Sequence, residues 1–230
     1  MKKYISYWSI YELIWLVTFC AVAIWITIAG GDSPFGFFVF LSGVLCVVLV
    51  AKGSILNYPI GLFNTLGYAW LSWQNGFYGE VIEYLFFYLP MMVIGFLMWR
   101  KHIDDNGIVS MKKLSYRFVV LISIVCIAVT AGFGFILSLI ETQNTPYIDA
   151  ATNVLAISAT ILMVRRYREQ WAAYIILNML SIIMWALRIA DGSPEGPLMV
   201  VMWSAYLVNS VYGFYNWTKG ARQTEGSITI

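Results

Sequence analysis

The stretch YLPMMVIGFLMWRK, Tyr88–Lys101, decides the fold, because the chain repeats it as YLVNSVYGFYNWTK, Tyr206–Lys219. Tyrosine, leucine, glycine, phenylalanine, tryptophan and lysine coincide in the two stretches without a gap. Such self-similarity indicates two copies of one structural unit. Each stretch is apolar and ends in a tryptophan with a basic residue within two positions of it, as membrane-spanning helices do at their cytoplasmic ends.

The composition is that of an integral membrane protein. The chain has 230 residues, of which 60% are hydrophobic and 11% are charged, whereas soluble domains carry about 25% charged residues. Apolar runs of roughly 20 residues predict membrane-spanning helices. We expect eight spans, the first of them a retained helix and not a cleaved signal peptide, at residues 10–29, 36–51, 54–74, 80–99, 118–140, 148–165, 171–190 and 197–217.

The basic residues predict the orientation of these spans. If the N-terminus is cytoplasmic and the spans alternate, all of the 14 Lys and Arg residues except Arg188 fall on the cytoplasmic side. This asymmetry is the positive-inside pattern, and it places both termini in the cytoplasm. We interpret the basic loops as determinants of topology and not as a surface for nucleic acid or lipid headgroups.

The repeat predicts an all-α membrane fold in which an N-terminal helix precedes a 3+1+3 arrangement of three-helix bundles. Since an odd number of crossings separates the two units, they enter the membrane in the same direction and are parallel repeats. A polar cavity between the bundles follows from this arrangement. The predicted parts are an N-terminal helix (1–35), a first bundle (36–101), a loop and linker helix (102–147), a second bundle (148–219) and a cytoplasmic tail (220–230).

Three asparagines lie inside predicted spans, namely Asn64, Asn178 and Asn209. An amide in hydrocarbon needs a partner, so each could be a hydrogen-bond clamp between helices. We pair Asn64 with Asn178 as corresponding positions of the two repeats. As a set, they are interpreted as lining a shared binding site.

The fourth span begins with an acid and an aromatic run. Glu83 lies about one turn inside the outer end of the span, and Tyr84 and Tyr88 follow it on one face. Pro90 predicts a kink near the middle of this helix. Glu83 is either a hydrated interfacial carboxylate or a group that receives a cationic ligand, and the sequence leaves both open.

Aromatic side chains and amides share stripes on the last two spans. Trp171, Tyr174, Asn178 and Trp185 follow one another at spacings of three, four and seven residues, and Asn209 ends a similar stripe on the next span. Flat rings with convergent amides suit a planar heteroaromatic ligand, and a cationic one gains cation–π energy. We therefore predict a small-molecule site.

The sequence contains none of the common catalytic motifs that we looked for. There is no GxxxxGK phosphate loop, no Cys/His spacing typical of metal ligands and no Ser/His/Asp set, since His102 is the one histidine and lies in a loop. The three cysteines lie inside apolar spans and are interpreted as packing residues. We expect neither a metal nor a cofactor.

The runs VAKGSILNYPIGLFNTLGYAW, FYGEVIEYLFFYLPMMVIGFLMWRKH, ILMVRRYREQWAAYIILNMLSIIMW and YLVNSVYGFYNW resemble the PnuC-type vitamin transporters. The resemblance covers nearly the whole chain after the first span. It implies a bacterial inner-membrane protein with a SWEET-like fold, assembled as a homotrimer. It also implies facilitated diffusion of an unphosphorylated vitamin, which a cytoplasmic vitamin kinase traps by phosphorylation.

Departures from the nicotinamide riboside branch of that family guide the choice of substrate. Pro90-Met91-Met92 stands where that branch has PMQ, Tyr174 stands where it has the second Trp of a Trp-x-x-Trp pair, and Tyr84-Leu85 stands for an Asn-Leu step. The sequence therefore resembles the thiamine-transporting PnuT branch more closely, and we predict thiamine as the substrate. Nicotinamide riboside is the alternative, because it is also a planar cation.

The residues predicted to bind the substrate are Asn64, Glu83, Tyr84, Tyr88, Trp171, Tyr174, Asn178, Trp185 and Asn209. Two other classes of function stay open at this stage. One is a membrane-embedded binding or sensor protein that does not move its ligand. The other is proton- or ion-coupled transport through Glu83.

Overall fold

A computed structural model describes residues 8–30, 34–74, 76, 78–141, 144–190 and 196–228. Contacts between residues divide the chain into two units, Met1–Ile108 and Val109–Ile230. In the described part of each unit the regular structure is helical, apart from two isolated β-bridges. The predicted all-α class is therefore confirmed.

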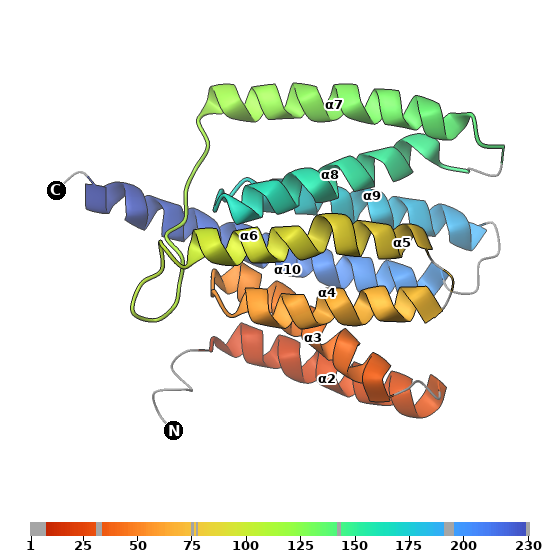
Figure 1. Cartoon of the computed structure of the whole chain (residues 1–230), viewed down its shortest axis with the longest axis horizontal. Coiled ribbons are helices and arrows are strands. Elements are labelled where there is room, and N and C mark those ends of the chain that lie inside the picture. The colour runs from red at the N-terminus through yellow and green to blue at the C-terminus, as the bar shows by residue number, and fades with distance from the viewer. Residues whose placement is uncertain are drawn as a thin grey trace. The chain divides into compact units, whose positions relative to one another are not determined.

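The first unit is built around one central helix, α4. This helix packs against α3 on one side and against α5, η1 and α6 on the other, and α2 packs on α3. Figure 1 shows α2, α3 and α4 following one another as neighbours. The elements are α2 (Ile10–Gly30), α3 (Pro34–Lys52), α4 (Asn57–Gln74), α5 (Tyr78–Glu83), η1 (Tyr84–Tyr88) and α6 (Leu89–Trp99).

The start of α2 is capped and tied to α3. Ser9 and Glu12 form a reciprocal capping box, since the Glu12 N–H donates to Ser9 Oγ at 3.2 Å and the Ser9 N–H donates to Glu12 Oε2 at 2.8 Å. The same carboxylate, 2% exposed, accepts a hydrogen bond from Lys52 Nζ at 2.9 Å. A buried ion pair thus fixes the first helix against the second.

The helix that carries Pro90 departs from the predicted geometry. Its irregular part is a π-helical turn, η1, which lies before the proline, and the Leu89 N–H donates to the carbonyl of Tyr84. Pro90 is at the first turn of α6, where its missing N–H costs least. A π-turn in the aromatic run thus precedes the proline, and such turns are frequent at functional sites.

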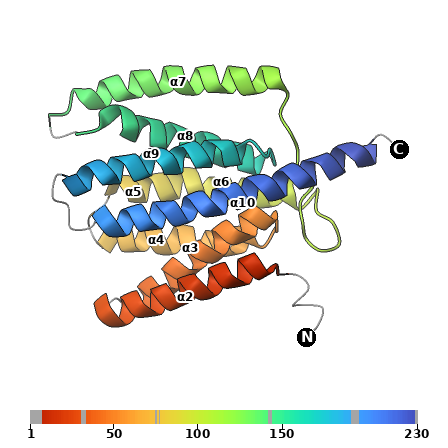
Figure 2. The same ribbon diagram turned by 180° about the vertical axis from the view of Figure 1, so that it is seen from behind.

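The second unit has the same plan. Its helix α9 packs between α8 and α10, and α7 packs on α8. Figure 2 shows α7, α8 and α9 in succession and the long α10 beside α9. The elements are α7 (Tyr116–Ser138), α8 (Pro146–Val164), α9 (Gln170–Ala190) and α10 (Gly196–Ile228). The segment 220–230, predicted as a tail, continues α10 as far as Ile228.

Five segments in the described part of the chain are long and apolar enough to cross a membrane. They are Pro34–Lys52, Glu80–Trp99, Tyr116–Ser138, Pro146–Val164 and Gln170–Ala190. Helix α2 is apolar over Ile10–Val22. The sequences of α4 and α10 carry asparagine, tyrosine and tryptophan, which lowers their hydropathy. The chain is thus a multi-pass helical membrane protein.

The same turn joins the first two helices of the three-helix core in each unit. In the first, Gly53 has φ 77° and the Ser54 N–H donates to the Leu49 carbonyl at 2.9 Å. In the second, Arg166 has φ 68° and the Tyr167 N–H donates to the Leu162 carbonyl at 2.9 Å. These are Schellman-type helix ends.

The segment after each turn also pairs with the loop between α6 and α7. The Ile55 N–H donates to the Gly107 carbonyl at 2.9 Å within the first unit, and the Arg168 N–H donates to the Lys112 carbonyl at 2.9 Å within the second. The turn and this pairing fix where α4 and α9 begin, and hence the register of the side chains on both helices.

Candidate functional site

The predicted binding residues fall on both units. We call Asn64, Glu83, Tyr84 and Tyr88 the first half-site, and Trp171, Tyr174, Asn178, Trp185 and Asn209 the second half-site. Each half-site lies on the central helix of its unit and on the helical segment that follows it. Their surroundings differ.

Stacked tyrosines dominate the first half-site. The rings of Tyr68 and Tyr84 lie 4.5 Å apart at an interplanar angle of 26°, and Tyr84 and Tyr88 lie 5.0 Å apart at 51°. Both distances are typical of attractive aromatic pairs. The π-turn carries Tyr84 and Tyr88. The structure therefore joins α4 to η1 through a ladder of three rings.

Tyr68 was missed by the sequence reasoning, although a signal was present. It follows Asn64 by four residues, so the two lie on the same face of α4. Its side chain is partly exposed, so the ring is accessible to a ligand. We therefore add Tyr68 to the first half-site.

Glu83 is the last residue of α5 and directly precedes the π-turn. Its side chain is half-buried, whereas Glu80, one turn earlier, is exposed. Within the described part of the chain, Glu83 forms neither an ion pair nor a hydrogen bond from its side chain. A half-buried carboxylate beside three tyrosines is suited to a cationic partner.

Asn64 holds α4 against α3. Its Nδ2 donates to the Val39 carbonyl at 2.8 Å and to Ser42 Oγ at 3.3 Å. The amide also lies against Gly43, where an added Cβ would be 3.0 Å from Nδ2. Asn64 is therefore an interhelical clamp in this structure, one of the two roles expected for it.

Trp171 is a packing residue between α9 and α10. It is 3% exposed, its ring lies over Gly213, and it meets Trp217 at 6.4 Å between centroids. Tyr174, half-buried, is 5.8 Å from Trp171. The indole N–H of Trp171 is buried and has no acceptor within the described part of the chain, which is unusual for a buried donor.

The first unit contains the same arrangement of ring and glycine. Tyr58, at the second position of α4, lies over Gly95 and contacts Trp99 edge-on at 5.0 Å. Trp171 is likewise at the second position of α9. The repeat found in the sequence, which aligns Gly95 with Gly213 and Trp99 with Trp217, is thus a repeat of packing.

Asn178 and Asn64 are not equivalent, which corrects the predicted pairing. Asn64 follows Tyr58 by six residues, but Asn178 follows Trp171 by seven. Asn178, 3% exposed, donates from Nδ2 to Ser210 Oγ on α10 at 2.9 Å, whereas Asn64 bonds to the preceding helix of its unit. A shift of one residue turns a helical side chain by about 100°.

The remaining members of the second half-site lie farther along the two helices. Asn209 is buried on α10, next to the Ser210 that Asn178 contacts. Trp185 is half-buried on α9, about two turns beyond Asn178. The ring of Trp203 is 5.8 Å from that of Tyr206, and the indole N–H of Trp203 is a second buried donor without an acceptor among the described residues.

A cavity of about 540 Å³ lies elsewhere in the second unit, between α7, α8 and α9. Its lining is mainly apolar and includes Cys126 and Ser158, whose Sγ and Oγ are 3.2 Å apart. None of the predicted binding residues lines this cavity. No group of three or more His, Cys, Asp or Glu side chains suited to a metal occurs among the residues that the structure describes.

The apolar helices define a class, that of multi-pass helical membrane proteins. Residues 33–219 match the family described as nicotinamide mononucleotide transporter. The chain belongs to this family, the PnuC family, and the predicted family resemblance is confirmed.

Individual relatives are similar over almost the whole chain. The nicotinamide riboside transporter PnuC of Haemophilus influenzae is 37% identical over 226 residues, which cover 97% of this chain and 96% of the relative. Its counterpart from Neisseria mucosa is 36% identical and covers 95% and 85% of the two chains. A crystal structure of the vitamin B3 transporter PnuC superposes with a TM-score of 0.76 at 36% identity and covers 94% of each chain.

These relatives overturn the predicted branch and substrate. The closer resemblance to the PnuT branch is wrong, and so is thiamine as the substrate, because these relatives and the similar structure are named for nicotinamide riboside or vitamin B3. The departures at Met92, Tyr84 and Tyr174 misled the sequence reasoning. Tyr174 belongs to an aromatic pair with Trp171, and one ring can replace another in such a pair without changing the ligand class.

Proposed function

We propose that this protein takes up nicotinamide riboside across the bacterial inner membrane. The observation that carries the proposal is the 37% identity over 97% of the chain to a protein named as a nicotinamide riboside transporter. Nicotinamide riboside is a pyridinium cation with a planar ring and a neutral ribose. Stacked tyrosines and a half-buried carboxylate in the first unit match its cationic ring.

The charge of the half-sites favours the riboside over the mononucleotide. A phosphate carries about −1.5 to −2 charges at neutral pH and is normally met by Arg, Lys or a helix N-terminus. The predicted binding residues include the carboxylate of Glu83 and neither Lys nor Arg. Binding a phosphate there would add repulsion to the cost of removing it from water.

The first half-site would bind the pyridinium part of the substrate. Glu83 and the ladder of Tyr68, Tyr84 and Tyr88 would attract and stack the ring. Substrate contact by Trp171, Tyr174, Asn178, Trp185 and Asn209 of the second half-site stays a prediction.

We further propose that the chain crosses the membrane eight times, as an N-terminal helix followed by the 3+1+3 parallel repeat. Each predicted span overlaps a helical segment of the described structure, which supports this count. The positive-inside pattern supports cytoplasmic termini. On this arrangement the bundles are residues 36–101 and 148–219, and the linker region is 102–147.

Transport by facilitated diffusion, trapping by a cytoplasmic kinase and a homotrimeric assembly stay predictions. The decisive experiment is uptake of labelled nicotinamide riboside into proteoliposomes that contain only this protein. We expect saturable uptake that equilibrates the inside and outside concentrations, with thiamine and nicotinamide mononucleotide as weak competitors. Binding without uptake would contradict transport and favour a binding or sensor protein.

A second arm of the same experiment addresses coupling. Because Glu83 is a half-buried carboxylate, a proton gradient across the liposome membrane could act through it. Facilitated diffusion predicts that an inward proton gradient leaves the final internal concentration equal to the external one. Accumulation above that level, abolished in Glu83→Gln, would overturn facilitated diffusion.

A further inference from the structure

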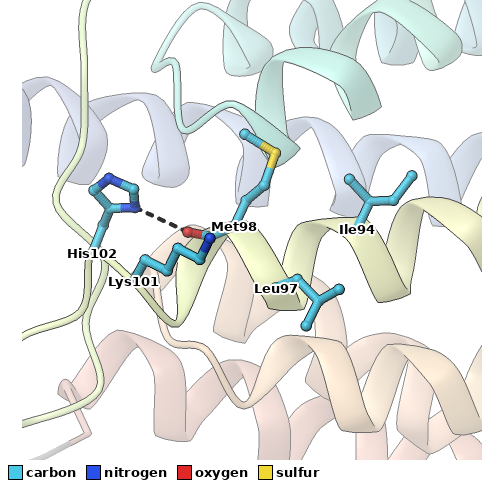
Figure 3. Close-up of a pocket in the computed structure, with 5 residues that line it drawn as sticks. All are labelled: Ile94, Leu97, Met98, Lys101 and His102. Carbon is cyan, nitrogen blue, oxygen red and sulfur yellow. Dashed lines mark hydrogen bonds between the residues drawn. The ribbon is translucent and has the colours of Figure 1, made fainter.

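A hollow of about 320 Å³ lies on the surface of the first unit where α6 ends. Ile94, Leu97 and Met98 form its floor, and Lys101 and His102 form one end. Figure 3 shows the three apolar side chains along α6 and the two basic side chains beyond its last turn. All five side chains are exposed.

The position of this groove relative to the membrane follows from the helix that bears it. Glu80–Trp99 is one of the segments apolar enough to span the bilayer, and Lys101 is two residues beyond its end. Ile94 and Met98 are separated by about 6 Å along the helix axis. The apolar floor is therefore at the edge of the hydrocarbon layer, and the basic end is at the depth of the lipid headgroups.

The basic end is held in a defined geometry. The His102 ring donates from Nδ1 to the Met98 carbonyl oxygen at 3.0 Å, which satisfies one of the last carbonyls of the helix. Nε2 then faces away from this bond and donates to an anion when the ring carries both protons. Arg100 adds a third exposed basic side chain. Two acids are nearby: Asp104 accepts hydrogen bonds at Oδ1 from the Asn106 and Ile108 N–H groups at 2.9 Å, and Asp105 is exposed.

We propose that this groove binds one anionic phospholipid, with an acyl chain on Ile94, Leu97 and Met98 and the headgroup phosphate on Lys101 and His102. The basic end lies at the depth of the headgroups and is continuous with the apolar floor. A lipid can contact both parts at once, whereas a soluble anion can contact only the basic end. Polybasic segments beside membrane spans attract anionic lipids for the same electrostatic reason. This inference does not depend on which vitamin the protein carries.

Native mass spectrometry of the full-length detergent-solubilised protein tests the proposal. The probes are dioleoyl phosphatidylglycerol and dioleoyl phosphatidylcholine at equal concentration. We expect the anionic lipid to be retained preferentially and the double variant Lys101→Gln/His102→Gln to reduce its occupancy about fivefold. The matched control is Lys113→Gln/Arg117→Gln, which removes exposed basic side chains outside the groove and should leave the occupancy unchanged.

A second variant keeps the proposal falsifiable if the double variant does not fold. Ile94→Trp adds bulk to the exposed floor and should reduce phosphatidylglycerol occupancy while leaving the basic end intact. Equal retention of both lipids would overturn the proposal, as would an equal loss in the control variant. Displacement of the lipid by millimolar inorganic phosphate would also overturn it, because the site would then be one for free phosphate.

Discussion

In the first unit the residue with positive φ after α3 is Gly53, and in the second the same place in the turn is taken by Arg166. Glycine adopts this conformation without strain, whereas other residues pay about 1–2 kcal/mol. Arg166 is buried and donates from its guanidinium to Ser110 Oγ at 2.6 Å and to the Ser110 carbonyl at 3.0 Å. In the second unit, the strain of the positive φ is thus offset by hydrogen bonds from Arg166 to Ser110. We call this contact, which holds the loop that precedes α7, the Arg166 lock.

The lock also affects the charges around it. Partial desolvation lowers the pKa of Lys112, and the neighbouring Arg166 guanidinium lowers the pKa of Lys112 further. Burial lowers the pKa of Arg166 as well, and Tyr167 partly opposes this effect. The first unit has no such group at Gly53. The two units therefore share their turns and their packing of a ring on a glycine, but they differ in the polar side chains around these features.

The packing of ring on glycine should be the most sensitive shared feature. Gly95→Ala and Gly213→Ala would each place a Cβ against the Tyr58 or Trp171 ring at a separation that real Cβ atoms do not show. We expect each to lower the free energy of unfolding by about 3 kcal/mol, since an overpacked site must move a buried ring. Thermal unfolding in detergent measures the loss.

Gly132→Ala on α7 is the matched control, because its Cβ would have no neighbour within 4 Å. We expect it to be neutral or slightly stabilising. If Gly95→Ala is tolerated while Gly213→Ala is not, the two units are not equivalent in packing, and the structural repeat is limited to the turns.

Two substitutions of Arg166 separate the contribution of its side chain from the strain of its positive φ. Arg166→Ala loses the charged hydrogen bonds to Ser110 and keeps the strained φ, so we expect a loss of about 2 kcal/mol. Arg166→Gly loses the same bonds but removes the strain, and it should be about 1 kcal/mol more stable than Arg166→Ala. Arg165→Ala, at the exposed neighbouring position, should change little. Equal stability of the Ala and Gly variants would refute backbone strain at Arg166.

Glu83 distinguishes the first half-site from the second, which contains no acid. Glu83→Gln removes the charge with little change in shape. We expect it to raise the KM for nicotinamide riboside uptake about tenfold, equivalent to about 1.4 kcal/mol. Glu80→Gln, one turn earlier and exposed, should leave KM unchanged. Equal effects of the two variants would show that Glu83 acts only through long-range electrostatics.

The smallest effect concerns the two asparagines. A double-mutant cycle of Asn178→Ala and Ser210→Ala should give a coupling of about 0.6–1.7 kcal/mol, as for other side-chain hydrogen bonds between membrane helices. The corresponding cycle of Asn64→Ala and Ser42→Ala should give less, because the shorter bond of Asn64 is to the Val39 backbone carbonyl. Equal couplings measured from unfolding would contradict the different partners of the two amides.

The candidate site could be predicted only in part. Spacing along a helix correctly gathered Tyr84 with Tyr88 and Trp171 with Tyr174, because residues three or four apart share a face. It missed Tyr68, which reaches Tyr84 from another helix. It also paired Asn64 with Asn178, because an alignment of residue types cannot detect a shift of one residue in helical register.

By itself, the sequence determined that this is a helical membrane protein of the PnuC family with a repeated packing motif. The membrane class follows from apolar run length and the packing motif from repeated residues, whereas the family follows from the resemblance of the four quoted runs. The π-turn before Pro90, the ladder of three tyrosines, the lock of Arg166 on Ser110 and the different partners of the asparagines were decided by the tertiary structure. Each depends on which groups distant in sequence satisfy a backbone or side-chain hydrogen bond or fill the space over a glycine, and residue order alone does not specify those partners.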